Sequence, residues 1–297
     1  MNQPVRFRVN NLFQPTRLDR LLRDRFPQWG RQAVQQLISA KQVRINDKTV
    51  WLASWKVNNG DHIEVRMVPD PKPLPPQHFA EQWLLAQDAD LVVVNKPAGL
   101  LSESPSMRDA ANLRDLAAAR FGDVILFHRL DRDTSGVVLL TRPGPINQSL
   151  ARAFQKGLVR KCYCAMIALP NALQPAGTIS ARLDQHPRRR DMMTVVDRGG
   201  KHAVTDYRVL AEDPATGRQL ILLYPQTGRT HQLRVHLAHL GSPILGDRLY
   251  GDASSADRLL LHAYQLDLPP LGGKPARRYT APLPAEFGHW AMEEETM

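Results

Sequence analysis

A run of prolines divides this chain into two parts. Residues 69–77 contain five prolines in nine positions. Proline fixes φ and lacks an N–H donor, so the run can form neither a helix nor a central strand, and it is typical of a stiff linker. A length of 297 residues is enough for about two domains. We therefore place a small domain at residues 15–68, a proline-rich linker at 69–80 and a larger domain at 81–290.

The composition excludes several classes of protein. With 43% apolar and 23% charged residues, the chain is neither collagen-like nor wholly disordered. No apolar run approaches the roughly 18 residues of a membrane span, and the N-terminus lacks the apolar stretch of a signal peptide. Cys162 and Cys164 are the only cysteines. We expect buried thiols in a reducing compartment rather than a zinc site, and hence a cytoplasmic protein that binds no membrane.

The net charge of +10 is concentrated near the N-terminus. Residues 1–70 hold 12 basic and 6 acidic side chains, which is more than half of the excess in under a quarter of the chain. Such a local excess suits a polyanionic partner, because each neutralised phosphate releases condensed counterions. A well-solvated basic surface would give the same count, so charge alone leaves both interpretations open.

The small domain has the pattern of two helices followed by strands. We expect the first helix to have its N-cap at Thr16, with Asp19 three residues on as in a capping box, and to end before Pro27. A second helix begins near Arg31, and short alternating strands follow between residues 43 and 65.

This pattern, with basic residues around the two helices, resembles the S4-type RNA-binding domain. The resemblance implies that Arg17, Arg31, Lys41 and Arg44 contact RNA. The family usually has glycine where Lys41 stands, at the corner between helix and strand. Lys41 must therefore adopt a backbone geometry that is unusual for its type, or the turn must shift.

The larger domain is rich in strands without regular strand–helix alternation. This favours an α+β fold built on a mostly antiparallel or mixed sheet. The expected strands are 91–94, 124–127, 137–140, 162–167, 204–209 and 220–224, and the expected helices are 147–154 and 231–240, the latter with Leu233, Leu237 and Leu240 on one face. Neither a P-loop nor a strand-linked G-x-G-x-x-G occurs, so we expect no nucleotide cofactor.

The densest chemical signal lies at residues 127–136, where an apolar strand runs into a polar turn. Asp131 and Asp133 are bracketed by Arg129 and Arg132, which would keep both carboxylates ionised. Loops at strand ends commonly display reactive side chains. The alternative is a structural loop held by salt bridges.

A second enzyme class could also use this turn. Aspartyl-phosphate hydrolases carry Asp-x-Asp-x-Thr after an apolar strand, with the first Asp as nucleophile. Here Thr134 comes one position too early. These enzymes also need Mg²⁺ held by a further acidic cluster, whereas Asp184 and Asp267 each stand alone.

The same turn is similar to a signature of the RluA-type pseudouridine synthases, and other motifs of that family follow in order. The matching segments are Asn95–Gly99, His128–Asp131 with Thr134–Gly136, Lys161–Tyr163, Thr227–His236, Gly246–Asp247 with Tyr250–Gly251, Leu261–Ala263 and Ala281–Pro284. Together they extend from about residue 83 to 286. The family isomerises uridine in RNA to pseudouridine without a cofactor or metal.

The resemblance implies a role for each matching residue. Asp131 matches the catalytic aspartate, and Arg229 the arginine that pairs with it. Tyr163 matches the aromatic residue beside the base, with a hydroxyl suited to the final deprotonation of C5. Arg129 matches the residue that enters the RNA stack when the uridine leaves it.

Three further residues are expected to bind the substrate. Leu233 would line the floor under the base, Lys96 lies on a turn near the pocket, and His128 adjoins Arg129. The spacing of His231, His236 and His239 gives no standard metal site, so we expect none.

The sequence thus predicts an RNA pseudouridine synthase with a basic recognition domain. The expected substrate is large-subunit ribosomal RNA, with tRNA as the alternative and no obligatory protein partner. A non-catalytic RNA-binding protein of the same fold is the alternative from another class, although it would not need Asp131, Tyr163 and Arg229 together.

Overall fold

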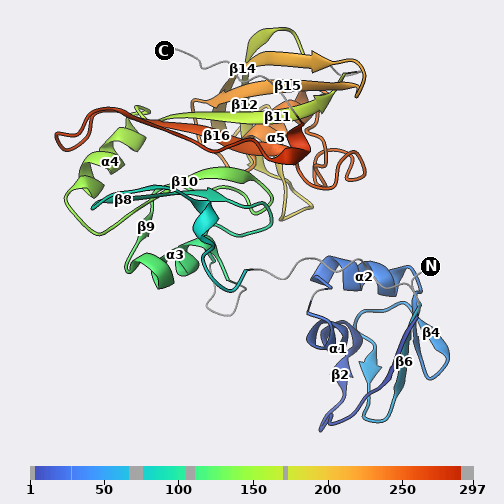
Figure 1. The fold of residues 1–297 in the computed structure, drawn as a ribbon. Coiled ribbons are helices and arrows are strands. Elements are labelled where there is room, and N and C mark those ends of the chain that lie inside the picture. The colour runs from blue at the N-terminus through green and yellow to red at the C-terminus, as the bar shows by residue number, and fades with distance from the viewer. Residues whose placement is uncertain (1–3, 28, 67–75, 105–110, 170–172, 289–297) are drawn as a thin grey trace. The chain divides into compact units, whose positions relative to one another are not determined.

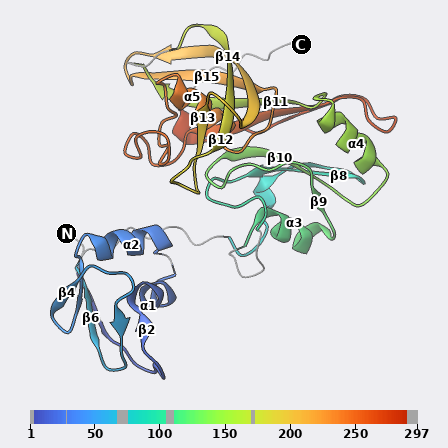
Figure 2. The same ribbon diagram turned by 180° about the vertical axis from the view of Figure 1, so that it is seen from behind.

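The computed structural model describes residues 4–27, 29–66, 76–104, 111–169 and 173–288. The chain forms two compact units, Met1–Pro75 and Pro76–Met297 (Figures 1 and 2). Among the described residues, no helix has both the length and the apolar character needed to cross a membrane.

The first unit packs two helices against a small antiparallel sheet. Its helices are α1 (Leu18–Arg25) and α2 (Arg31–Ser39). The sheet has the order β1-β6-β3-β4, and β2 pairs separately with β5. The bounds are β1 Val5–Arg8, β2 Thr16–Arg17, β3 Val43–Ile45, β4 Lys48–Val50, β5 Lys56–Val57 and β6 His62–Val65. Apolar side chains of both helices and of the sheet form one buried core.

The start of this unit differs from the prediction in two ways. Strand β1 lies before residue 15 and pairs with β6, so the sheet includes residues that the sequence left outside the small domain. Thr16 is not an N-cap, because it belongs to β2, and Arg17 occupies the N-cap position without a side-chain cap. The Asp19 carboxylate instead accepts from the Arg17 guanidinium, with Nε at 2.9 Å from Oδ1. The helix ends at Arg25, before Pro27, as predicted.

Lys41 adopts the left-handed backbone conformation, with φ of +59°. This is the first of the two possibilities that the sequence left open. It keeps the corner between α2 and β3 in place, at a conformational cost of about 1 kcal/mol or more for a residue other than glycine.

The second unit is built on an 11-stranded sheet with the order β13-β12-β14-β15-β11-β16-β10-β8-β7. Strand β9 pairs with β10 and β17 with β16 at the sides of this path. Within this sheet, every described strand pairing is antiparallel except β10 with β16, which confirms a mostly antiparallel, mixed sheet. The strands are β7 Leu84–Gln87, β8 Leu91–Lys96, β9 Ile125–Leu126, β10 Ser135–Thr141, β11 Arg160–Ala168, β12 Ala176–Gln185, β13 Met193–Val196, β14 Lys201–Asp213, β15 Arg218–Pro225, β16 Leu261–Leu268 and β17 Arg277–Thr280.

Helices cover both faces of the β8–β10 end of this sheet. These are α3 (Leu113–Phe121) and α4 (Ile146–Gln155), which Figure 1 shows on opposite sides of β8 and β10. Alternate residues of each strand point to opposite faces: Val93 and Leu139 pack with α4, whereas Val94 and Leu140 pack with α3. Two covered faces explain why these strands are continuous apolar runs in the sequence.

Helix α5 (Gln232–His239) follows β15 and packs through Leu233 and Leu237 against the core of the other half of the sheet. Leu240 does not share that buried face, since the helix has ended and the side chain is 43% exposed. The expected strands and helices are otherwise present. In this unit the sequence missed α3 and the strands β7, β12, β13, β16 and β17, of which β16 lies in the middle of the sheet.

Gly136 lies near the start of β10, at a position that only glycine can occupy without strain. This position has φ of +115°, and a Cβ atom here would lie 2.2 Å from the carbonyl oxygen of Ala263 on β16. The parallel pairing of β10 with β16 therefore needs glycine, and it fixes where the preceding loop leaves the sheet.

Candidate active site

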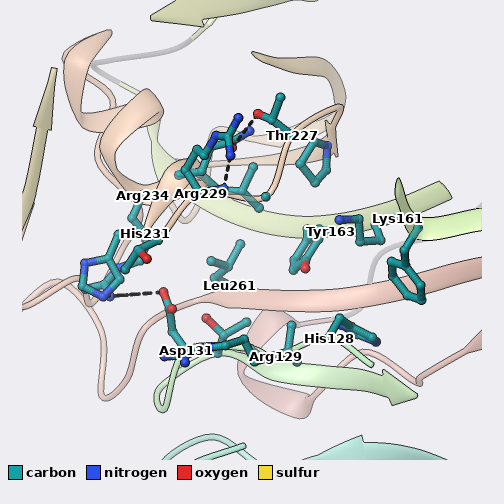
Figure 3. Close-up of a pocket in the computed structure, with 18 residues that line it drawn as sticks. His128, Arg129, Asp131, Lys161, Tyr163, Thr227, Arg229, His231, Arg234 and Leu261 are labelled. Carbon is teal, nitrogen blue, oxygen red and sulfur yellow. Dashed lines mark hydrogen bonds and ion pairs between the residues drawn. The ribbon is translucent and has the colours of Figure 1, made fainter. Parts of the chain in front are cut away.

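A pocket of about 300 Å³ opens in the second unit (Figure 3). Three segments form most of it, namely the loop before β10, the start of β11, and the turn from β15 into α5, and α4 and β16 contribute one residue each. Its lining residues are His128–Asp131, Thr134, Phe154, Lys161, Tyr163, Pro225, Thr227–Arg234 and Leu261. In Figure 3, Asp131 and Lys161 lie at opposite ends of the pocket, with Tyr163 between them.

The loop that carries Asp131 is held through its main chain on both sides. Ser102 Oγ donates to the Leu130 carbonyl oxygen at 2.8 Å and accepts from the Leu130 N–H at 3.0 Å. On the other side, the Arg132 carbonyl oxygen accepts from the Gly99 N–H at 2.8 Å and from Lys96 Nζ at 3.1 Å. These bonds hold the residue between them in one place.

Lys96 was expected to bind substrate, and the structure contradicts this. Its side chain is fully buried and does not line the pocket. The ammonium donates to the carbonyl oxygens of Pro97, Leu100 and Arg132 at 2.8–3.1 Å. Burial lowers the pKa of Lys96 to about 7, against the opposing effect of Asp133 and Asp131. Lys96 therefore stabilises the loop that carries Asp131 through its hydrogen bond to Arg132.

The Asp131 carboxylate faces the pocket beside two basic side chains. Its Oδ2 lies 3.6 Å from Nη1 of Arg234 and 3.9 Å from Nε2 of His231. The Asp131 side chain is 27% exposed, so it remains accessible to a ligand in the pocket. Both basic residues come from the start of α5, where positions three apart lie on one side of the helix.

Arg234 is fixed by a buried carboxylate. Its Nε and Nη2 donate to the two oxygens of Asp247 at 2.8 and 2.7 Å. Asp247 is fully buried and also accepts from the N–H groups of Leu249 and Tyr250. The bidentate geometry holds the guanidinium rigidly, and the Arg234 pKa is raised by its bond to Asp247 although burial acts to lower it.

Arg229, predicted to pair with Asp131, does not contact it in this structure. Its Nε donates to the carbonyl oxygen of His202 at 3.0 Å, and the residue is exposed. Arg229 lies in the turn before the helix, whereas Arg234 lies on the helix and on the same side as His231. The predicted helix over residues 231–240 could have identified Arg234 as a neighbour of the site, because it placed Arg234 one turn from His231.

Gln232 organises the turn that leads into α5. Its Oε1 accepts from the Thr227 hydroxyl at 2.7 Å and from the Arg229 N–H at 3.0 Å. Its Nε2 donates to the Val204 carbonyl oxygen at 2.9 Å, which ties the turn to β14. His231, the residue before Gln232, has φ of +54°, a left-handed conformation in which its ring faces Asp131.

Tyr163 projects into the pocket from β11. It lies at a register shift in the pairing of β11 with β16, opposite Ala263. Burial, together with the negative charge of Asp131, raises the pKa of Tyr163. The hydroxyl thus stays protonated at neutral pH, and its ring offers an apolar face for a planar ligand.

The other residues predicted to bind substrate line the pocket in different ways. Leu233 is 7% exposed and supplies apolar surface. Arg129 is largely exposed, with Nη1 at 3.3 Å from Glu103. His128 has a structural task that the sequence did not indicate: its Nε2 accepts from the Leu139 N–H at 3.0 Å. Burial lowers the His128 pKa to about 3, so the ring is neutral.

Lys161 brings a positive charge to the pocket far from Asp131. Burial lowers the pKa of its ammonium. The sequence supplied the motif that contains Lys161 but no role for this residue. Only its position beside Tyr163 in the folded pocket identifies it as a candidate for binding an anionic part of a ligand.

The candidate RNA contacts of the first unit lie on several elements. Arg17 is bound to Asp19 at the start of α1, and Lys41 is exposed at the corner after α2. Arg44 lies on β3, 3.9 Å from Glu64 on β6. The side chain of Arg31 lies outside the described residues.

Comparisons with known proteins agree with both units. The sequence model of the RNA pseudouridylate synthase family matches residues 90–239, and that of the S4 domain matches residues 16–63. A ribosomal large subunit pseudouridine synthase D from Xylella fastidiosa is 34% identical over 91% of this chain and 86% of its own length. A protein from Zymomonas mobilis that is named an uncharacterized RNA pseudouridine synthase is 40% identical over 67% of this chain and 93% of its own length.

A solved structure shows the same catalytic fold. Human RNA pseudouridylate synthase domain containing 1 has a TM-score of 0.58 and 28% identity, covering 67% of this chain and 82% of its own. The matched residues 90–239 include Asp131, Tyr163 and Arg234. The chain therefore belongs to the RluA-type RNA pseudouridine synthases, enzymes that isomerise uridine in RNA, and carries an S4 domain at its N-terminus.

Proposed function

We propose that this enzyme isomerises specific uridines of large-subunit (23S) ribosomal RNA, with Asp131 as the catalytic group. The observation that carries the proposal is the accessible Asp131 carboxylate, held beside Arg234 and His231 in a pocket that also contains Tyr163. In the reaction the N1–C1′ bond breaks and a C5–C1′ bond forms. N1 gains a proton and C5 loses one, so nothing is transferred to a second molecule.

A fixed carboxylate can assist the first of these steps in two ways. It can attack a carbon of the nucleotide, or it can accept a proton from the ribose. Either route uses the carboxylate oxygens, and Oδ2 lies 3.6 Å from Nη1 of Arg234. Because Asp247 holds Arg234 rigidly, the guanidinium directs the carboxylate without competing for the substrate.

Tyr163 is suited to the base itself. Its ring can stack on uracil, and its hydroxyl can take part in moving the C5 proton. The raised pKa of Tyr163 means that the hydroxyl must pass its own proton on when it accepts another. Arg129, exposed at the pocket, is placed to fill the gap that the flipped nucleotide leaves in the RNA.

The choice of ribosomal RNA rests on the relatives that align along nearly the whole chain. Several are named ribosomal large subunit pseudouridine synthase D, and the alignments cover 85–91% of this chain. The buried Cys162 and Cys164 suit a reducing compartment, and we place the enzyme in the cytoplasm.

The test is pseudouridine formation on unmodified transcripts of 23S ribosomal RNA and of tRNA, with excess EDTA present in a parallel reaction. We expect product on the ribosomal transcript in both conditions. Product on the tRNA transcript alone would mean that the substrate is tRNA and not ribosomal RNA. Loss of activity with EDTA would support the alternative of a metal-dependent hydrolase. Position-resolved mapping of RNA from cells with and without the gene then identifies the uridines.

A further inference from the structure

Tyr250 lies behind both basic residues that face Asp131. It belongs to the loop between α5 and β16 and does not line the pocket. Its hydroxyl lies 2.8 Å from Nδ1 of His231, and its ring lies under the Arg234 guanidinium at 5.1 Å. One side chain therefore contacts both partners of the carboxylate.

The hydroxyl of Tyr250 has a defined direction. It accepts a hydrogen bond from the N–H of Met193, the first residue of β13, at 2.8 Å. A phenol has a single proton to donate. Among the described residues, His231 Nδ1 is the acceptor within reach of that proton. The Tyr250 hydroxyl thus donates to Nδ1, and neutral His231 carries its own proton on Nε2.

That proton points toward the catalytic carboxylate. Nε2 of His231 lies 3.9 Å from Oδ2 of Asp131, and Nη1 of Arg234 lies 3.6 Å from the same oxygen. Both distances exceed a hydrogen bond, but such contacts commonly tighten when substrate closes the site. Two donors then face Oδ2, which leaves Oδ1 for the substrate.

The charges around His231 come from four segments. Asp131, Asp247 and Asp191 act to raise its pKa, Arg234 acts to lower it, and burial has the largest effect. The His231 pKa is lowered as a result, so the ring is neutral near pH 7. A neutral imidazole must choose one tautomer, and the hydrogen bond to its other nitrogen makes that choice.

We propose that Tyr250 is a positioning residue, which fixes His231 as the Nε2–H tautomer and supports Arg234, so that both donors engage Oδ2 of Asp131 and free Oδ1 for reaction. This rests on the proposed role of Asp131. Tyr250 acts through His231 and Arg234 and does not touch the reacting atoms.

The main test compares Tyr250→Phe, which keeps the ring under Arg234, with the parent enzyme. We expect kcat to fall about tenfold or more, with RNA affinity unchanged. The Phe variant no longer favours the neutral imidazole, so the His231 pKa rises. A protonated His231 makes the Asp131 carboxylate a weaker base and nucleophile. The acidic limb of the pH profile of kcat therefore moves to higher pH.

Two further variants separate the two contacts of Tyr250. In the His231→Gln background, Tyr250→Phe should cost almost nothing more, because the hydroxyl has lost its target. Tyr250→Leu should lose more activity than Tyr250→Phe, since it also removes the support of Arg234. Additive losses in the double variant, or an unchanged pH profile for Tyr250→Phe, would overturn the proposal.

The tautomer can be read directly in the folded parent enzyme. Nitrogen-15 chemical shifts distinguish a protonated Nε2 from a protonated Nδ1, and His231→Gln identifies the signal among ten histidines. A protonated Nδ1 in the parent would refute the proposal even if every variant misfolded. Asp131→Asn on the same RNA distinguishes the two hypotheses. Activity in that variant would contradict the proposed function. If that variant is inactive and the pH profile of kcat for Tyr250→Phe is unchanged, only this inference is contradicted.

Discussion

The positive charges of the two units are held in different ways. On the sheet of the first unit, Arg6, Arg44 and Arg66 lie 2.8–3.9 Å from one carboxylate, Glu64. Arg6 and Arg66 are 74% and 46% exposed, so water and salt reach them easily. In the pocket, Arg234 is 6% exposed and holds a fully buried carboxylate in bidentate geometry.

This contrast separates affinity from geometry. Exposed ion pairs contribute about 0.2–1 kcal/mol and exchange partners readily, so the first unit can turn its arginines toward RNA phosphates at little cost. Breaking a buried pair costs about 3–5 kcal/mol, so Arg234 stays in place whatever the substrate does. The first unit is thus suited to binding and the second to fixing one carboxylate.

The variant with the largest expected effect on this separation of RNA binding from chemistry is Asp131→Asn. The amide has the same shape but is a poor nucleophile and a poor base, so we expect no product while RNA affinity stays nearly unchanged. Pseudouridine formation and binding are measured separately on one ribosomal transcript. Turnover within about tenfold of the parent, a barrier change of only ~1.4 kcal/mol, would show that Asp131 is not the catalytic group.

Tyr163→Phe keeps the stacking ring and removes the hydroxyl. We expect the glycosidic bond to break and pseudouridine not to accumulate, because the C5 proton has no acceptor. Single-turnover analysis of the RNA detects a trapped species that lacks the N1–C1′ bond. Unimpaired product formation would mean that the phenol only stacks on the base.

The matched pair Arg234→Gln and Arg6→Gln tests the contrast between buried and exposed arginines directly. We expect Arg234→Gln to destabilise the second unit by about 3–5 kcal/mol, because Asp247 is left buried without its partner. Arg6→Gln should cost less than about 1 kcal/mol. Chemical denaturation, followed by probes specific to each unit, measures both. Similar costs would contradict the division.

Removal of residues 1–75 should weaken RNA binding more than it damages chemistry. The two units have separate cores, so we expect the remaining unit to be folded with its pocket formed. Its log affinity should fall less steeply with log salt than that of the full chain, since fewer phosphates are neutralised. Equal slopes on one RNA fragment would mean that the first unit does not contact phosphate.

The sequence predicted most of what depends on local pattern. Continuous apolar runs marked β8 and β10, and the motif order pointed to Asp131 and Tyr163 as pocket residues. It failed where the partner is set by tertiary packing. Arg229 and Arg234 both belong to one motif, and only the start of α5 at Gln232 decides which of them faces the carboxylate.

Lys96 shows the same limit from the other side. A lysine in a turn near a pocket suggests a substrate contact, because lysine is rarely buried. Three carbonyl oxygens converge on this ammonium from segments 36 residues apart in the chain. No local pattern encodes that convergence, whereas β10 and α4 follow from their own residues.

The bonds that hold the residues on either side of Asp131 end on main-chain atoms of the loop. Ser102 hydrogen-bonds the N–H and the carbonyl oxygen of Leu130, and Gly99 and Lys96 donate to the carbonyl oxygen of Arg132. Main-chain atoms are the same for nearly every amino acid, so these contacts do not depend on which side chains the loop carries. The exposed Arg132 side chain can therefore be exchanged for another, for instance to suit a different RNA, while the Asp131 carboxylate stays in place.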